Sequence, residues 1–384
     1  MSRSQGHGSQ MRRRRMHEAF AAVALAGVLV LISAASAQGS RRWGVQPAGN
    51  VPDAFCHSCG GPPQVSQQDA GLMRAAHVGI VRIYLSWPGI QPSEHGAYDW
   101  GPIDQAVGNL ASRGISALPV LFGSPSYVAS NPVRPPVRSK KARSEWKAFV
   151  RAAVNRYGRG GTYWKSPLLY KSQFPLRAAK PVKDWQIWNE ENLPRYLASK
   201  KPVRDYGRLL KLSHQAIKKA DHRAKVILGG MPGYSKVHSW TFLKHLYRVH
   251  GVKRSFDAGA LHPYAPSQHL VAFQVNRYRH VMRRHHDAHT PIWFTEFAWG
   301  SGHPDGGINK GLKGQARNLK KSFRMFVRER HRWHLKRVIW YDWIDPPSRG
   351  ECGGNSFCDT AGLLFSNYTQ KPAYHAFKRF AGSH

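Results

Sequence analysis

Two glutamates follow apolar, tryptophan-rich stretches of a sequence that is otherwise strongly basic. Glu190 ends the stretch WQIWNE (185–190), and Glu296 ends the stretch PIWFTE (291–296). The chain holds only 21 Asp and Glu residues against 58 Lys and Arg residues, so carboxylates in these surroundings need an explanation. Two carboxylates that share an aromatic cleft suit the cleavage of a glycosidic bond. One can protonate the leaving oxygen, while the other attacks the anomeric carbon or activates water.

Eight short apolar segments are the candidate strands that would position these glutamates. They are residues 43–46, 80–87, 115–122, 184–189, 225–230, 257–262, 291–296 and 337–343. Several are nearly continuous apolar runs, which are typical of parallel strands buried on both faces. The alternation with helical segments predicts an α/β fold, a (β/α)8 TIM barrel formed by residues 38–384 as a single domain. An open doubly wound sheet is the alternative, but no Gly-x-Gly-x-x-Gly motif follows the first strand.

The helical segments are recognised by apolar residues on one face. The spacing in 146–157 predicts a helix with Ser144 as its N-cap and Gly158 just after its end. Similar apolar stripes occupy residues 103–111, closed by Gly114, and residues 206–220 and 316–327. The Pro-rich basic segment 131–143 and the segment 159–183 are expected to be long surface loops.

A (β/α)8 barrel would bring the two glutamates to the same place. Side chains that carry out chemistry lie at the carboxyl ends of the strands in this fold. Glu190 would follow the fourth strand and Glu296 would end the seventh, three β/α units further along. Either glutamate alone could be a salt-bridged surface residue, but the pair at matching positions favours catalysis.

Several motifs, in this order, resemble glycoside hydrolase clan A, and most closely family 39 and related family 5-like secreted glycosidases. The Asn-Glu signature of that clan is similar to Trp188-Asn189-Glu190. The matching segments are residues 81–100, 185–194, 206–230, 256–265, 291–301 and 338–345. The resemblance implies a retaining glycosidase that cleaves O-glycosidic bonds of a polysaccharide or oligosaccharide by double displacement. It implies no cofactor and no metal.

The resemblance also implies roles for individual residues. Glu190 would be the general acid/base and Glu296 the nucleophile. Asn189 would bond the sugar 2-hydroxyl, while Arg82 would hold Glu296 ionised and Tyr264 would donate a hydrogen bond to it.

Further residues are expected to shape the sugar site by the same resemblance. His262 would lie near Glu190, Trp299 would line the cleft, and Trp343 or Trp340 would form its floor. One position departs from the family, which usually reads Asn-Glu-Pro, because Glu191 stands in place of the proline. Glu191 is expected to pair with a basic residue, to contact substrate, or to raise the pKa of Glu190 by its charge.

The N-terminus resembles an export signal. Arg12 to Arg15 form a charged region, residues 19–32 are apolar, and residues 35–37 form an Ala-x-Ala cleavage site. Cleavage of residues 1–37 would give a secreted, extracellular protein, whereas an uncleaved segment would be an N-terminal anchor. No later stretch is long and apolar enough to suggest a membrane span.

The formal net charge of +37 indicates which kinds of molecule the protein could bind. Such a charge favours contact with acidic or wall-associated polysaccharide, although it could equally be a solvated surface. The charge is spread along the chain without a recognisable nucleic-acid module, so no nucleic-acid partner is predicted. We expect a monomer with a carbohydrate substrate. The alternatives are a catalytically weak barrel that binds polysaccharide through its basic surface, and a transglycosylase.

The four cysteines are Cys56, Cys59, Cys352 and Cys358. An even number in an exported chain predicts disulfide bonds, and a zinc site is the alternative. Local pairing of Cys352 with Cys358 is preferred, but cross-bridges between the two pairs stay open.

Overall fold

The apolar segments pair as parallel strands in the computed structural model, which describes residues 42–47, 65–347 and 357–383. Nine strands form one sheet in the order β5-β4-β3-β2-β1-β9-β8-β7-β6. They are β1 (Trp43–Val45), β2 (Ile80–Ser86), β3 (Ser116–Phe122), β4 (Asp184–Ile187), β5 (Lys225–Ile227), β6 (Met231–Pro232), β7 (Gly259–His262), β8 (Ile292–Phe297) and β9 (Leu335–Trp340). Each of the eight predicted strands overlaps an observed strand and is confirmed, and β6 is an additional two-residue strand directly after the predicted fifth strand.

β5 and β6 are the two edge strands of the sheet, and they lie where the curved sheet closes toward a barrel. β5 pairs with β4, and β6 pairs with β7, so the two strands belong to neighbouring sides of one barrel. A single parallel bridge between Ile227 and Ala258 joins the two sides, and the barrel is only partly closed there. Gly230 lies in the gap with a φ of +87°, and a Cβ atom on it would come within 2.3 Å of His262 Nε2. The break thus makes room for a side chain of the site.

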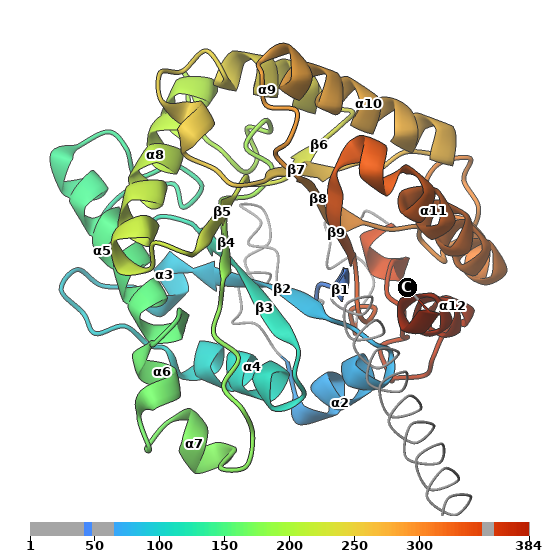
Figure 1. Ribbon diagram of the computed structural model, residues 1–384, viewed down its shortest axis with the longest axis horizontal. Helices are drawn as coiled ribbons and strands as arrows, with labels where there is room; N and C mark the ends of the chain where they lie inside the picture. Colours follow the sequence, from blue (N-terminus) through green and yellow to red (C-terminus); the bar gives the residue numbers. More distant parts are fainter. Residues whose placement is uncertain (1–41, 48–64, 348–356, 384) are drawn as a thin grey trace, which may run out of the picture.

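Helices form a ring outside the strands (Figure 1). They are α2 (Gln67–Ala75), α3 (Trp87–Ile90), α4 (Gly101–Ser112), α5 (Lys140–Tyr157), α6 (Thr162–Lys165), α7 (Tyr170–Gln173), α8 (Pro202–Ala220), α9 (Ser239–Leu246), α10 (Gln268–Arg284), α11 (Gly311–Trp333) and α12 (Pro372–Ser383), with short 3-10 turns at Val252–Arg254 and Cys358–Thr360. The apolar face of each long helix packs on the strands and forms the core. No helix in the described ranges is long and apolar enough to cross a membrane.

One helix starts earlier than the sequence suggests. α5 begins at Lys140, and the side chain of Ser139 caps it by accepting a hydrogen bond from the Ala142 N–H at 3.0 Å. The predicted cap Ser144 is therefore wrong, because it lies inside the helix. The segment 159–183 also holds α6 and α7, so it is not a plain loop.

Parallel strands give the barrel two different ends. The carboxyl ends of all nine strands meet at one end, here the C-terminal rim, and the amino ends meet at the N-terminal rim. Glu190 follows β4, His262 ends β7 and Glu296 lies near the end of β8, so all three belong to the C-terminal rim.

Candidate active site

The guanidinium of Arg82 is the centre of the hydrogen-bond network at the C-terminal rim. Arg82 lies on β2 and has no exposed surface. It donates to Glu296 Oε1 at 2.5 Å, to Asn189 Oδ1 at 2.8 Å, to Gln186 Oε1 at 2.7 Å and to Gln46 Oε1 at 2.5 Å. A buried guanidinium needs several acceptors, and these four hold it in one orientation. Arg82 in turn holds Asn189 and Glu296 in place.

Glu296 is a buried carboxyl with two donors. Besides Arg82 on one oxygen, the Tyr264 hydroxyl donates to Glu296 Oε2 at 3.1 Å. Burial raises the pKa of Glu296, while the charge of Arg82 and the hydrogen bond from Tyr264 oppose that shift. Both donors favour the ionised carboxylate, which is the form that a nucleophile requires.

Glu190 stands on an unusual piece of backbone. Its φ is +44° and that of Trp188 is +69°, so both residues lie in the left-handed region that non-glycine residues seldom adopt. The Glu190 N–H donates to the Gly230 carbonyl at 3.1 Å, and the Trp188 indole N–H donates to the Tyr196 carbonyl at 2.5 Å. Such positions cost about 1–3 kcal/mol each and concentrate at functional sites.

The proton on Glu190 is favoured by its surroundings. Burial raises the pKa of Glu190 well above its usual range, and the negative charge of Glu296 raises it further. Arg82 opposes this shift, but its direct contact is with Glu296. The two carboxyls therefore differ in character, since one is supported as an acid and the other as a carboxylate.

His262 connects the two glutamates. Its Nδ1 lies 2.9 Å from Glu190 Oε1 and 3.3 Å from Glu296 Oε2, and its Nε2 lies 3.0 Å from the Thr295 hydroxyl. Burial, followed by the charge of Arg82, lowers the pKa of His262 well below its usual range, so the ring is neutral. Gln186 donates to the Thr295 oxygen at 3.1 Å, which leaves the hydroxyl proton for Nε2. Nδ1 then carries the ring proton and donates to the carboxyls.

The same three residues could by type hold a cation. One atom from each of Glu190, His262 and Glu296 lies within 4.8 Å of the others, and the described residues hold no other such cluster. Arg82 already supplies a positive charge 2.5 Å from Glu296. The positive charge of Arg82 would repel a metal ion at this position, so the arrangement fits acid–base chemistry better than metal binding.

The structure gathers most of the sequence-predicted site residues and leaves two out. The residues that meet at the C-terminal rim are Arg82, Asn189, Glu190, His262, Tyr264 and Glu296. Trp343 is buried, with its indole N–H donating to Asp69 Oδ1 at 3.1 Å. Trp299 is buried as well, and its N–H donates to Ser322 of α11 at 3.1 Å. Both rings are directed toward the surrounding helices and do not line the cleft, which corrects the expectation. Trp340 is buried also, bonded to the Ala361 carbonyl at 3.0 Å.

Two residues at the end of β9 were missed. The ring of Tyr341 lies 6.5 Å from that of Tyr264, which itself bonds Glu296. Asp342 is a further buried carboxyl at this rim. Burial raises the pKa of Asp342 well above its usual range, and the nearby groups of Cys358 and Glu296 add to the shift. Residues 340, 341 and 343 are all aromatic, so the sequence could not predict which of them faces the site.

Glu191 lies away from the cleft. It has no exposed surface, and a Cβ atom on Gly229 would come within 2.2 Å of its Oε2. Burial raises the pKa of Glu191 to about 8, and its own backbone is the largest of the groups that oppose the shift. It forms no ion pair with any described residue, so the expected basic partner is wrong. Its effect on the pKa of Glu190 is smaller than those of burial and of Glu296.

Comparison with known families gives a partial match. The model of glycoside hydrolase family 42, described as beta-galactosidase, matches residues 60–132. That stretch includes Arg82 but reaches neither Glu190 nor Glu296. No curated protein matches the chain.

Solved structures match most of the chain. A family 39 glycoside hydrolase from Bacteroides cellulosilyticus WH2 has a TM-score of 0.65 and 20% identity over 90% of this chain and 64% of its own length. A glucosidase from Croceicoccus marinus has a TM-score of 0.61 and 15% identity over 89% of this chain and 67% of its own. A monomeric beta-xylosidase from Caulobacter crescentus CB15 has a TM-score of 0.60 and 17% identity over 88% and 67%.

These likenesses establish the (β/α)8 fold. This chain spans 64% of the length of the first structure, which is therefore a larger protein. The family 42 match covers residues 60–132 alone, so the family of the whole chain belongs to the proposal that follows.

Proposed function

We propose that the chain is a retaining glycoside hydrolase, with Glu190 as the general acid/base and Glu296 as the nucleophile. The observation that carries the proposal is the spacing of the two carboxyls, whose oxygens approach within 4.8 Å at one rim of the barrel. Retaining enzymes hold their carboxyls about 5–5.5 Å apart, whereas inverting enzymes leave about 6.5–9.5 Å for a water molecule. The similarity to glycosidases of several specificities supports the reaction class.

The first half of the reaction would form a covalent sugar ester. The Glu296 carboxylate attacks the anomeric carbon while Glu190 gives its proton to the glycosidic oxygen. The bond between that oxygen and the anomeric carbon breaks, and the leaving alcohol departs. Asn189, whose Oδ1 accepts a hydrogen bond from Arg82 at 2.8 Å, would bond the 2-hydroxyl of the sugar. This bond strengthens in the transition state.

The second half would release the sugar. Esterification removes the charge of Glu296, which is one of the influences that raise the pKa of Glu190. The pKa of Glu190 then falls, so Glu190 can take a proton from water as the water oxygen attacks the anomeric carbon. The ester bond breaks, Glu296 regains its carboxylate, and Glu190 is protonated again.

The substrate in this proposal is an O-glycoside within an oligosaccharide or polysaccharide. Tyr341, in place of Trp343 or Trp299, would supply the aromatic surface next to the sugar. The similar structures carry the names of a glucosidase, a beta-xylosidase, an exo-beta-1,4-mannosidase and beta-galactosidases, so a panel of aryl β-glycosides is the natural first screen.

Export also belongs to the proposal. The signal-like residues 1–37 lie outside the described residues, as do Cys56, Cys59 and Cys352. Secretion and the disulfide bonds therefore stay predictions from the sequence, and the fourth cysteine, Cys358, is described near the site.

The test follows the anomeric configuration of the first product by proton NMR. A β-aryl glycoside is expected to release a β-sugar, which then mutarotates. Release of the α-anomer first would contradict the retaining mechanism. Added acceptor alcohol distinguishes a transglycosylase, because glycoside transfer would then exceed hydrolysis. Sugar binding with no turnover of any substrate would favour a barrel that only binds polysaccharide.

A further inference from the structure

A second hollow lies at the N-terminal rim, on the end of the barrel opposite to Glu190 and Glu296. Its volume is about 620 Å³, and residues at the starts of β4, β5 and β9 contribute to its wall. A smaller hollow of about 180 Å³ adjoins it and shares Lys183, Asp184 and Arg337. We call the larger hollow the basal bowl and define it by its cationic residues, which are Arg42, Lys183, Lys225, Arg330, Lys336 and Arg337.

The basal bowl has little negative charge of its own. Only Asp184 and Asp257 line it, and Asp257 already accepts from Lys218 Nζ at 3.1 Å and from the Val226 N–H at 2.8 Å. A seventh cation on the wall, Arg159, is paired with Asp221 at 2.8 Å. Asp184 lies near Lys183, Lys225 and Arg337, whose charges all oppose the rise of its pKa that burial causes. The bowl therefore holds more cations than carboxylates.

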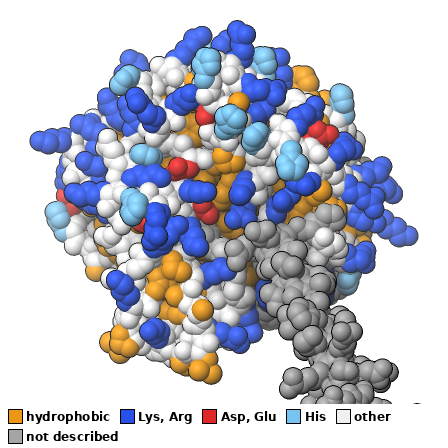
Figure 2. Space-filling view, in the orientation of Figure 1, with side chains coloured by type: hydrophobic (Ala, Val, Ile, Leu, Met, Phe, Trp, Pro, Cys, Tyr) orange, Lys and Arg blue, Asp and Glu red, His pale blue; other side chains and the backbone are white. Residues whose placement is uncertain are grey.

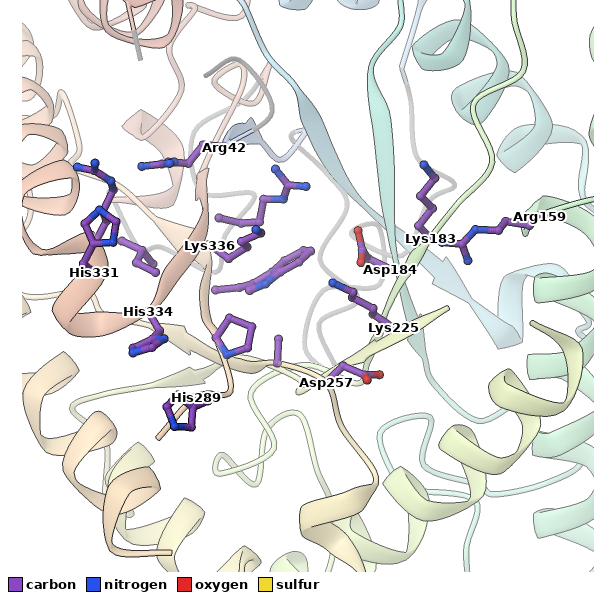
Figure 3. Close-up of a pocket in the computed structure, with 16 residues that line it drawn as sticks. Arg42, Arg159, Lys183, Asp184, Lys225, Asp257, His289, His331, His334 and Lys336 are labelled. Atoms are coloured by element: carbon purple, nitrogen blue, oxygen red, sulfur yellow. The ribbon is translucent and has the colours of Figure 1, made fainter. Parts of the chain in front are cut away.

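The three lysines of the bowl are available to a ligand. Lys183, Lys225 and Lys336 are exposed, and none of them forms an ion pair with a described residue. Figure 3 shows that they come from different parts of the ring, with Lys183 and Lys225 on one side and Lys336 on the other. Charges that surround a hollow from several sides match a ligand with more than one anionic group.

The positive groups also disfavour one another. Burial lowers the pKa of Arg42, and the nearby charge of Arg330 lowers it further. Burial likewise lowers the pKa of His334, with added contributions from Arg279 and from His289, whose ring lies 6.1 Å away. Like charges held together cost free energy, which a bound anion would recover.

We propose that the basal bowl binds a multivalent oxyanion, meaning a compact molecule or the end of a polymer that carries two or more phosphate, sulfate or carboxylate groups. The arginines Arg42 and Arg330 offer forked donors to such groups, and the three lysines add point charges. The site lies at the rim that carries no catalytic glutamate, so the proposal does not rest on the proposed function.

A general basic surface is the competing explanation. Figure 2 shows Lys and Arg side chains spread widely over the face in view, with few acidic side chains among them. Any protein of net charge +37 attracts anions at low salt, so the experiment needs a control with the same total charge.

The experiment compares two triple variants by isothermal titration calorimetry with sodium tripolyphosphate as the probe. One variant carries Lys183→Gln, Lys225→Gln and Lys336→Gln in the basal bowl. The control carries Lys313→Gln, Lys321→Gln and Lys378→Gln, three exposed lysines on α11 and α12 outside the bowl. Circular dichroism melts check that both variants fold. The bowl variant is expected to bind tripolyphosphate about tenfold more weakly than the parent, and the control within about twofold of it.

Dextran sulfate in a second arm separates the two sources of the anion. Weaker binding of both probes in the bowl variant supports a site that also accepts the end of a polymer. Weaker binding of tripolyphosphate alone supports a small-anion site. Weaker binding of dextran sulfate alone supports a site for the end of a polymer. Equal losses in the two variants for both probes, or no binding of either probe by the parent, would overturn the proposal. Glycosidase activity enters none of these readouts.

Discussion

At the scale of single residues, the two catalytic candidates differ in a way that substitution can expose. Glu296→Ala removes the proposed nucleophile and should abolish turnover of every substrate. Glu190→Ala removes the proposed acid and should lower kcat/KM about 10²–10⁴-fold for poor leaving groups, but far less for good ones. Steady-state kinetics on a series of aryl glycosides measure this difference.

The neighbouring glutamate provides the control for that experiment. Glu191 is buried away from the cleft, so Glu191→Ala should show no dependence on the leaving group. If Glu191→Ala showed that dependence and Glu190→Ala did not, the assignment would be off by one residue. Azide should restore turnover of Glu296→Ala and give a glycosyl azide of inverted configuration. A product of retained configuration would argue against Glu296 as the nucleophile.

Glu191 also predicts how stability changes with pH. Its pKa is raised from 4.5 to about 8 in the folded protein, so folding favours its protonated form. The contribution is fully present below about pH 4.5 and is lost as pH rises through about 8. Ionisation at high pH then costs on the order of several kcal/mol.

Urea unfolding at pH 5 and at pH 8.5 measures this cost. Glu191→Gln keeps the shape of the side chain and cannot ionise, so its free energy of unfolding should fall less between the two pH values than that of the parent. Other buried carboxyls titrate equally in both proteins and drop out of the comparison. Identical pH dependence in the two proteins would show that Glu191 ionises without cost.

At the scale of elements, the strands could be predicted and the ends of the elements could not. Uninterrupted apolar runs define the strands because parallel strands are buried on both faces, and the two glutamates were found because they end such runs. The start of α5 was missed because residues 139–143 hold one small apolar residue, Ala142, among polar and charged ones, which is too little to show a helical apolar face. The burial of Glu191 could not be predicted from the sequence, because Tyr206 and Gly229, which surround it, come from later elements.

The end of β9 shows the same limit and gives a prediction. Sequence alone could not choose among the aromatic residues there, whereas the structure directs Tyr341 toward Tyr264 and Trp343 toward Asp69. Tyr341→Ala should raise KM about fivefold, the equivalent of about 1 kcal/mol of ring contact. Trp343→Phe should lower the melting temperature and leave KM unchanged. A raised KM in Trp343→Phe alone would restore the original expectation.

At the scale of the whole molecule, the basic surface predicts a salt effect that depends on the substrate. If an acidic polysaccharide is the substrate, KM for it should rise steeply between low and high salt, because exposed charges are screened. Activity on a small neutral aryl glycoside should barely change. Kinetics with both substrates over the same salt series measure the contrast. Equal responses would mean that the charge of +37 only keeps the surface solvated.

The order of the strands bears on when activity can appear. Arg82 and Glu296 are 214 residues apart in the chain, and Asn189 is 107 residues from the same guanidinium. β1 pairs with both β2 and β9, so the first and last strands must meet before the ring is complete. Contacts between such distant segments form slowly and late in folding. A partly folded chain therefore holds the two glutamates without the geometry that the proposed roles require, and we expect any glycosidase activity to appear in one step as the ends of the chain come together.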